Sequence, residues 1–365
     1  MSTRFSRLWI VGALVSLSFG CAARSFQPTF KTLERPEPEK IAQELAQLTP
    51  RAPEAQVLVA ITDEPRRMVA WDLSALDKGP LWQHDVDAKS APVIAGSTVV
   101  LQEGDSVTVR DLATGERRAS LGGDGARLVG AAGEGDGVVI TLALAEGESS
   151  KGRVAYVQGS RVRFQQDSSL EAGTPALARG YVLVPWATHR LSVLDPKDGA
   201  ELARFHWNAA VLGHVFVEGD GVYMGQHGFV RVGPVLLEDK RAPQPTPIAP
   251  LARQLPGQPP LLADGYAPVP EPESAAHHLR ADFRLGDSGL QDDTFYTRFF
   301  RFIFAHKASA DELRFVHVLP RDVVGAQVVR GGLLVSDEAG VLSFVDTSGQ
   351  SRVIAELGRR LHVAA

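Results

Sequence analysis

The chain has 365 residues, of which 44% are hydrophobic and 22% charged, with a net charge of −5 and a pI near 6.1. The negative charge argues against a nucleic-acid-binding protein. Cys21 is the one cysteine, so no disulfide can form within the chain, and stability must come from a buried core.

Residues 1–20 have the pattern of a signal peptide. Arg4 and Arg7 form a basic start, and residues 8–19 are an apolar run that is too short to span a bilayer. The segment resembles a bacterial lipoprotein signal, in which the next residue, here Cys21, becomes the first mature residue and carries acyl chains. Ala22, rather than Asp, follows the cysteine, and by the same resemblance this implies an anchor in the outer membrane rather than the inner one. We expect a lipidated Cys21, with plain secretion as the alternative, and no other stretch predicts a membrane span.

Residues 21–56 have the composition of a tether. Five prolines keep the stretch extended, and between them residues 39–48 can form a short helix with Ile41, Leu45 and Leu48 on one face. The sequence therefore predicts a spacer that carries the folded domain, residues 57–365, away from the lipid surface.

An internal repeat organises the folded domain. Gly96, Asp111 and Gly115 recur at one constant offset of 84 residues, and the same offset brings back Glu-Gly-Asp-Gly-Val from residues 134–138 at residues 218–222. The later counterparts of the first three are Gly180, Asp195 and Gly199. Fainter copies lie at residues 68–73, 152–159, 228–233 and 332–349.

Each unit consists of short apolar strands bounded by Gly and Asp. The Asp-x-x-x-Gly ends of the units are typical of turns, because the Asp side chain accepts hydrogen bonds from the backbone just after it and Gly adopts a positive φ. Half of 84 is 42, close to the length of a four-stranded propeller blade. The sequence predicts an all-β propeller of about seven blades, with six or eight also compatible with the spacing. The repeated Asp residues are then structural rather than catalytic.

The repeat is interrupted after residue 233. Residues 234–272 contain 11 prolines, which cannot occupy interior strands because proline lacks a ladder donor. We interpret this stretch as an insertion, after which two or three further blades share the remaining residues.

Residues 295–304 contain six of the 26 Phe, Trp and Tyr residues of the chain. One interpretation is a blade strand whose two faces pack between neighbouring blades. The other is an interaction patch of the aromatic and arginine side chains that are enriched at protein interfaces. The candidate patch comprises Phe295, Tyr296, Arg298, Phe299, Phe300, Arg301 and Phe302.

No catalytic, cofactor or metal site is predicted. Ser288 lies in a Gly-Asp-Ser-Gly sequence like that of a serine protease, but His277 is too close in sequence to come from a separate half-barrel. The His277-His278 pair has no further ligands at metal-binding spacing.

The units resemble the PQQ-like β-propeller repeat. The resemblance rests on Trp82, Pro92, Gly96 and Asp111 and on the Thr-Gly-Glu at residues 114–116, with the later copies. The resemblance is compatible with two classes of protein. Quinoprotein dehydrogenases carry adjacent cysteines over their cofactor and a Ca²⁺ site, and this chain has no cysteine beyond Cys21. The order of signal, lipidated cysteine, tether and propeller is instead similar to that of BamB-type lipoproteins.

That resemblance implies a non-catalytic scaffold on the periplasmic side of the outer membrane, bound to the machinery that assembles β-barrel proteins there. A second interpretation stays open, in which an envelope or surface lipoprotein holds a different protein or a polysaccharide. The long insertion is the feature that keeps it open.

Overall fold

The computed structural model describes residues 37–49, 57–62, 66–75, 78–123, 125–146, 149–208, 211–218, 220–225, 229–237, 262–263, 267–268, 294–307, 312–329, 332–358 and 361–364. Within these ranges the regular structure is antiparallel β-sheet, apart from α1 (Pro38–Leu45) and the 3₁₀ turn η2 (Pro234–Leu236). In the same ranges no helix has the length and hydropathy of a membrane span.

Four consecutive stretches of chain each form one sheet, and we number these sheets as blades 1 to 4. Blade 1 contains β1 (Val57–Thr62), β2 (Arg67–Asp72) and β3 (Trp82–Asp85), together with β28 (Leu361–Ala364) from the other end of the chain. Blade 2 contains β4 (Val93–Ala95), β5 (Thr98–Glu103), β6 (Ser106–Asp111) and β7 (Arg117–Gly122). Blade 3 contains β8 (Arg127–Glu134), β9 (Gly137–Glu146), β10 (Ser149–Gln158) and β11 (Arg161–Ser168). Blade 4 contains β12 (Ala176–Ala178), β13 (Tyr181–Pro185), β14 (Arg190–Leu194) and β15 (Glu201–His206).

The remaining sheets follow in the same order. Blade 5 contains β16 (His214–Glu218), β17 (Gly221–Gly225) and β18 (Phe229–Arg231). Blade 6 contains β21 (Thr294–Phe299), β22 (Phe302–Lys307) and β23 (Glu312–Val318). Blade 7 contains β24 (Val323–Val329), β25 (Gly332–Asp337), β26 (Val341–Asp346) and β27 (Ser351–Glu356). Of the predicted insertion, the described parts are η2 and the short pair β19 (Leu262–Ala263) and β20 (Ala267–Pro268).

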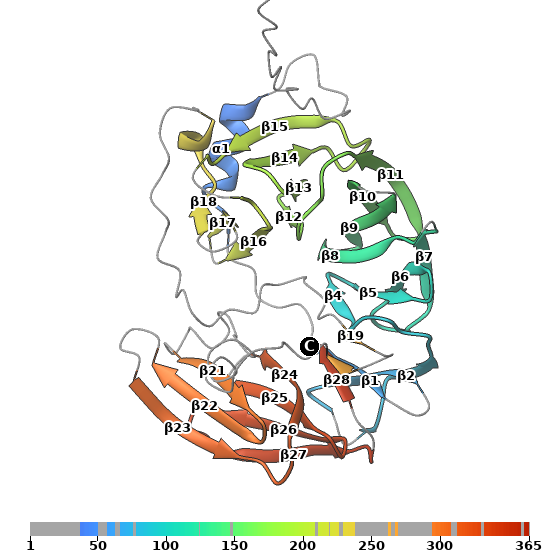
Figure 1. The fold of residues 1–365 in the computed structure, drawn as a ribbon, viewed down its shortest axis with the longest axis vertical. Coiled ribbons are helices and arrows are strands. Elements are labelled where there is room, and N and C mark those ends of the chain that lie inside the picture. The colour runs from blue at the N-terminus through green and yellow to red at the C-terminus, as the bar shows by residue number, and fades with distance from the viewer. Residues whose placement is uncertain are drawn as a thin grey trace, which may run out of the picture.

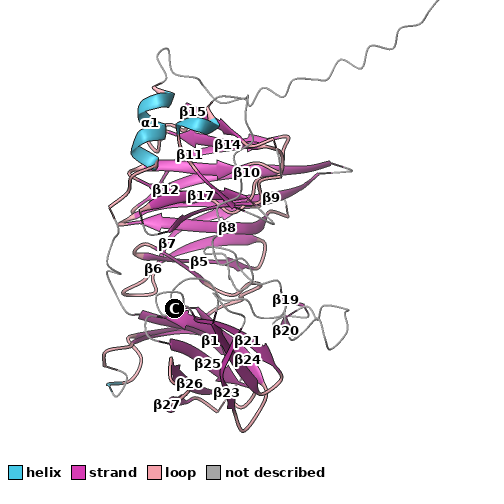
Figure 2. Ribbon diagram, turned by 90° about the vertical axis from the view of Figure 1, so that its left-hand side faces the viewer, coloured by secondary structure: helices cyan, strands magenta, loops and turns pink. Residues whose placement is uncertain are grey.

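The blades are arranged in a ring with their first strands toward the middle (Figure 1). β4 lies against β8, β8 against β12, β12 against β16, and β24 against β28. Seen from the side, the strands of blades 2, 3 and 4 follow one another in height, from β5 and β6 up to β14 and β15 (Figure 2). The two ends of the folded domain meet in blade 1, because β28 pairs with β1, with Val59 opposite Ala364. The predicted all-β propeller is confirmed, and the described sheets agree with seven blades.

The repeat seen in the sequence is explained by this arrangement. An offset of 84 residues moves the chain by two blades, from blade 2 to blade 4 and from blade 3 to blade 5. The Asp-x-x-x-Gly segments join the third strand of a blade to its outer strand. Asp111 Oδ1 accepts hydrogen bonds from the amides of Ala113 and Thr114, at 2.8 and 2.9 Å. The structural interpretation of the repeated Asp is thus correct.

The glycine of that turn is the point at which one blade contacts the blade before it. Gly115 has φ +73, and a Cβ there would lie 2.6 Å from the Trp82 ring of blade 1 and closer still to His84. Trp82 also donates its indole N–H to the Leu112 carbonyl at 2.9 Å. The same contact recurs between Gly199 and Phe164 of blade 3. It recurs a third time between Gly349 and Phe315 of blade 6.

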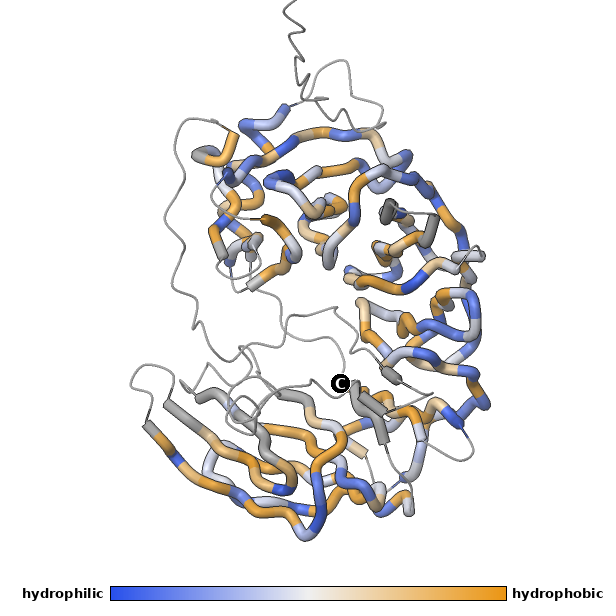
Figure 3. Tube along the Cα trace, viewed as in Figure 1, coloured by the Kyte–Doolittle hydropathy of each residue, from blue (hydrophilic) through white to orange (hydrophobic). Residues whose placement is uncertain are grey.

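The hydrophobic core lies mainly between blades. The middle strands of the blades, such as β5 and β25, are buried along their whole length and are rich in hydrophobic residues (Figure 3), so each sheet presents apolar side chains on both of its faces. One cluster joins blades 2 and 3 through Val100, Val107, Ile140 and Leu142, all fully buried.

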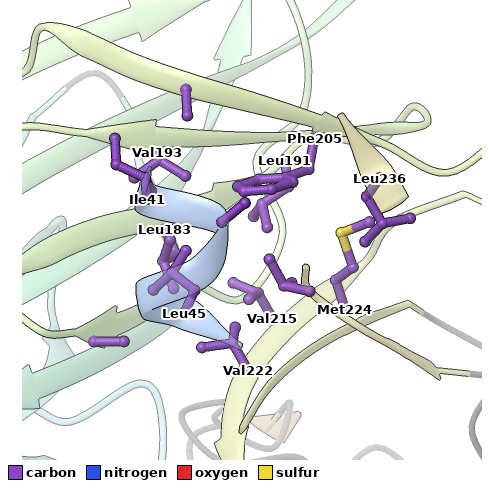
Figure 4. Packing of buried hydrophobic residues seen from close by; sticks show 14 of the residues in the cluster. Ile41, Leu45, Leu183, Leu191, Val193, Phe205, Val215, Val222, Met224 and Leu236 are labelled. Carbon is purple, nitrogen blue, oxygen red and sulfur yellow. The ribbon is translucent and has the colours of Figure 1, made fainter. Parts of the chain in front are cut away.

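Helix α1 belongs to this core. Ile41 and Leu45 are buried in a cluster formed by blades 4 and 5, with Leu183, Val193 and Val222 among their neighbours (Figure 4). The helix predicted within residues 39–48 is therefore present, but it packs on the propeller. The described part of the predicted tether is not a free spacer.

Polar contacts fix the helix in place. Tyr181 of blade 4 donates to Glu44 at 2.9 Å, and burial together with this carboxylate raises the pKa of Tyr181 to about 12. Arg231 of blade 5 donates to the Ala46 carbonyl at 2.8 Å, and the Leu48 amide donates to the Asp220 carbonyl at 2.7 Å. The helix therefore covers the outer side of blade 5, where the described residues form three strands.

Replacing Gly115 with alanine tests the contact between blades. The added methyl group must clash with Trp82 and His84 as well as occupy a positive φ, so we expect a loss of several kcal/mol of unfolding free energy. Gly180→Ala is the matched control: its φ is +75 and no atom lies within 4 Å of the new Cβ, so it should cost only about 1–2 kcal/mol. Equal losses for both variants in chemical denaturation would contradict a packing role for Gly115.

Candidate interaction surface

The aromatic segment of the sequence forms a β-hairpin in blade 6. β21 and β22 are joined by a turn at Phe300 and Arg301, whose carbonyls accept hydrogen bonds from the amides of Val323 and Leu319, at 3.0 and 2.9 Å. These two hydrogen bonds connect the turn to residues 319–323, which follow β23. The end of β23 therefore lies beside the turn.

One face of this hairpin is buried against blade 7. Tyr296 is fully buried, and its ring centroid lies 6.3 Å from that of Phe315 on β23. Ile303 and Ala305 share this face and pack with residues of blade 7 such as Leu333. Tyr296 is therefore a core residue, and its assignment to a surface patch was wrong, because the register turns it toward the neighbouring blade.

The opposite face is apolar and partly open to solvent. Phe302 pairs with Val318, and Phe304 pairs with Val316. The two valines are 50% and 42% exposed, and the rings are half-buried, 6.3 Å apart between centroids. The Arg301 guanidinium lies 5.7 Å from the centre of the Phe302 ring. We define the blade 6 surface as Phe300, Arg301, Phe302, Phe304, Val316 and Val318.

Phe300 has an unusual backbone conformation. Its φ is +50, in the left-handed region, and its side chain is 62% exposed. The corresponding turn of blade 2 has Gly104 with φ +54 at this position. A phenylalanine there costs about 1–2 kcal/mol relative to glycine, so the fold itself would favour glycine. This turn therefore holds an exposed aromatic residue in a backbone conformation that favours glycine.

The sequence therefore located the hairpin but identified only part of this surface. Phe300, Arg301 and Phe302 lie on it, and the side chains of Phe295, Arg298 and Phe299 lie outside what the structure describes, as does Cys21. Val316 and Val318 were missed. Their signal is the run of residues 313–318, where apolar side chains occupy both faces of an outer strand, a position that usually carries charges.

His214, the first residue of β16, is a second candidate for a functional residue. Burial lowers its pKa to about 4, and its Nδ1 lies 3.0 Å from the Thr174 hydroxyl at the junction of blades 4 and 5. Shifted pKa values often accompany active sites. Across the described ranges, however, no three His, Cys, Asp or Glu side chains gather as a metal site. His214 is explained by packing, since Gly173 and Gly213 bring these blades into backbone contact.

Comparison with known proteins supports the fold. No protein-family model and no curated protein sequence matches the chain. Among solved structures, the chain is similar to the dihydro-heme d1 dehydrogenase NirN, with 14% identity, a TM-score of 0.54 and coverage of 85% of this chain and 77% of NirN.

Two further similar structures have lower TM-scores. BamB from Moraxella catarrhalis has 13% identity, a TM-score of 0.36 and 85% of each chain covered. The Cps50 (Swd1) β-propeller domain from Myceliophteria thermophila has 12% identity, a TM-score of 0.44 and coverage of 85% and 95%. At such low identity these similarities concern the fold alone, and the predicted resemblance holds at that level: the chain is a β-propeller.

The lowered pKa of His214 predicts a loss of stability in mild acid. In the unfolded chain His214 is protonated below its ordinary pKa of 6.5, whereas in the folded chain it is protonated only below about pH 4. The free energy of unfolding should therefore fall between pH 6.5 and 4, by about 3 kcal/mol from this group. His214→Gln, which can still bond the Thr174 hydroxyl, should reduce that fall in denaturation measured at pH 6.5 and 5. An unchanged pH profile for His214→Gln would contradict the assignment.

Proposed function

We propose that this protein is a β-propeller scaffold that binds another protein through the blade 6 surface. The observation that carries the proposal is Phe300, an exposed aromatic residue held at φ +50 where a glycine would fold with less strain. Beside it, Val316 and Val318 leave the outer strand of the blade apolar rather than charged. Outer strands are normally protected against contact with other chains, and exposed apolar patches of this kind are typical of docking sites.

The chemistry of the surface favours a protein partner over a sugar or a nucleic acid. Aromatic rings and an arginine stacked on one of them are the residue types that dominate protein interfaces. Arg301 lies over the Phe302 ring and is itself exposed, so it can pair with a carboxylate or an aromatic ring of the partner. We infer a partner surface that is apolar at its centre and acidic or aromatic at its rim.

The sequence suggests where the scaffold works. The signal-like residues 1–20 and Cys21 support a lipid anchor in the outer membrane, with the propeller on the periplasmic side. The order of signal, cysteine and propeller supports a partner in the machinery that assembles β-barrel proteins. A different envelope partner, protein or polysaccharide, is the alternative, and the long proline-rich stretch after blade 5 is the feature that favours it.

Phe300→Gly separates binding from folding. It removes the ring and relieves the positive φ, so the unfolding free energy should stay level or rise by about 1 kcal/mol. Partner capture by cross-linking in the native envelope should nevertheless fall about tenfold, as for an aromatic anchor of an interface. Recovery of barrel-assembly subunits by the unaltered chain supports the specific assignment.

The matched control is Arg179→Gly. Arg179 also has a positive φ, +52, but lies on blade 4, so this variant should leave capture unchanged. If Phe300→Gly captured the partner as well as the unaltered chain does, the blade 6 surface would not be the docking site. Capture of a different abundant envelope component would replace the barrel-assembly assignment with the alternative.

The lipid anchor is tested separately. Mass spectrometry of the amino-terminal peptide from membranes should show the chain beginning at Cys21 with a mass increase from acyl chains. Cys21→Ser should move the protein to the soluble envelope fraction, whereas an unmodified terminus at another residue would refute lipidation.

A further inference from the structure

The blade 6 surface has the form of a narrow apolar stripe along two strands. Its members lie in two facing rows, one on β22 and one on β23. The register extends the row on β23 to Leu313, which pairs with residue 306, two positions after Phe304, and is 50% exposed. From Leu313 to Val318 the stripe is about 17 Å long, at about 3.3 Å per strand residue, and its two rows are about 5 Å apart.

The same propeller holds a helix on another apolar surface. α1 packs on blades 4 and 5 through Ile41 and Leu45, which are 3% and 0% exposed and lie about one helical turn apart. At the carboxyl end of α1, the Arg231 guanidinium lies 6.0 Å from the centre of the Tyr223 ring and donates to the Ala46 carbonyl at 2.8 Å. An aromatic ring thus positions a cation at the negative end of the helix dipole.

Arg301 has the corresponding position on the blade 6 surface. Its guanidinium lies 5.7 Å from the centre of the Phe302 ring, and the residue is exposed. It lies at the end of the stripe next to Val318, because Phe302 follows it in the chain and pairs with Val318. The stripe therefore combines exposed apolar rows with a cation at one end, the two features by which this chain holds α1.

The dimensions of the stripe fit a single helix. A helix is about 10 Å wide and rises about 1.5 Å per residue, so about eleven residues cover the length of the stripe and one helix covers both rows. A helix also satisfies its own backbone groups when it packs on the face of a sheet. A single strand laid on that face would bury amides and carbonyls without hydrogen-bond partners.

We propose that the blade 6 surface binds one amphipathic helix of the protein partner, with the carboxyl end of that helix at Arg301. The apolar side of the helix packs on the aromatic and valine side chains of the surface. Its last carbonyls accept hydrogen bonds from the Arg301 guanidinium. This inference rests on the proposed function, because it specifies the partner of the same surface.

Photo-cross-linking in the native envelope tests the helix and its direction. Benzoylphenylalanine replaces Leu313, Val316 or Val318, one position in each variant of the full chain. Mass spectrometry of the cross-linked peptides should place all contacts in one partner segment, at residues three or four apart. Position 318 should cross-link nearer the carboxyl end of that segment than position 313 does, since Arg301 lies beside Val318. The matched control is Val162 on the outer strand of blade 3, 39% exposed, which should not cross-link to this segment.

The outcomes separate this inference from the proposed function. Contacts at every second partner residue would show a strand, and contacts spread over several segments would show a broader surface; either result would overturn the helix. The reverse order along the segment would overturn the placement of its carboxyl end. In each of these cases a cross-linked partner is still recovered, so the proposed function stands. A lack of any cross-linked protein from all three positions would overturn both.

Replacing Arg301 tests the charge at the end of the helix. Arg301→Glu places a negative charge beside the negative end of the helix dipole, so capture of the cross-linked partner should fall about fivefold. Arg301→Lys keeps the positive charge and should keep most of the capture. Arg301 is exposed, so both variants should unfold at the same denaturant concentration as the unaltered chain. Equal capture by the Glu and Lys variants would overturn the position of the helix end.

Discussion

The contact between an aromatic side chain of one blade and a turn glycine of the next blade is the constraint on which the rest of this structure depends. Gly115, Gly199 and Gly349 each receive an aromatic side chain from the outer strand of the preceding blade. Because a Cβ would occupy that space, the turn must have both a positive φ and no side chain. The Asp before each turn supplies the hydrogen bonds that shape it, which is why Asp and Gly recur together while the strands between them vary.

That constraint also determines how much the sequence could predict. Positions fixed by backbone geometry recur at constant spacing, so the fold, the place of the turns and the structural role of Asp111 were all accessible. The direction of a side chain was not: Tyr296 and Phe300 lie four residues apart, yet one is fully buried and the other exposed. Their difference arises from the pairing of β21 with β22 and from blade 7. Leu45 was likewise predicted to lie on the apolar face of a helix. The sequence did not show that this face packs against blades 4 and 5, which only the tertiary structure reveals.

Helix α1 packs on the outer side of blade 5, where the described residues contribute three strands. Ile41 and Leu45 supply apolar contacts on the outer side of blade 5, and Arg231 uses the Ala46 carbonyl at the end of the helix as an acceptor. A helix satisfies its own backbone groups, so it leaves no new sheet edge exposed there. In blade 6, by contrast, an outer strand with Val316 and Val318 exposed remains open at the surface.

The pairing of β28 with β1 has a consequence for the order of events during folding. Residues 59 and 364 are neighbours in blade 1, so the first blade cannot be finished until the last part of the chain has emerged. Blades 2, 3 and 4, each made of consecutive strands, need only local contacts and can form early. Pairing β1 with β28 closes the longest loop in the molecule and therefore has the largest loop-closure entropy cost. Before this pairing forms, the inner edge of β1 is unpaired and β24 lacks its contact with β28, which exposes the chain to aggregation and proteolysis.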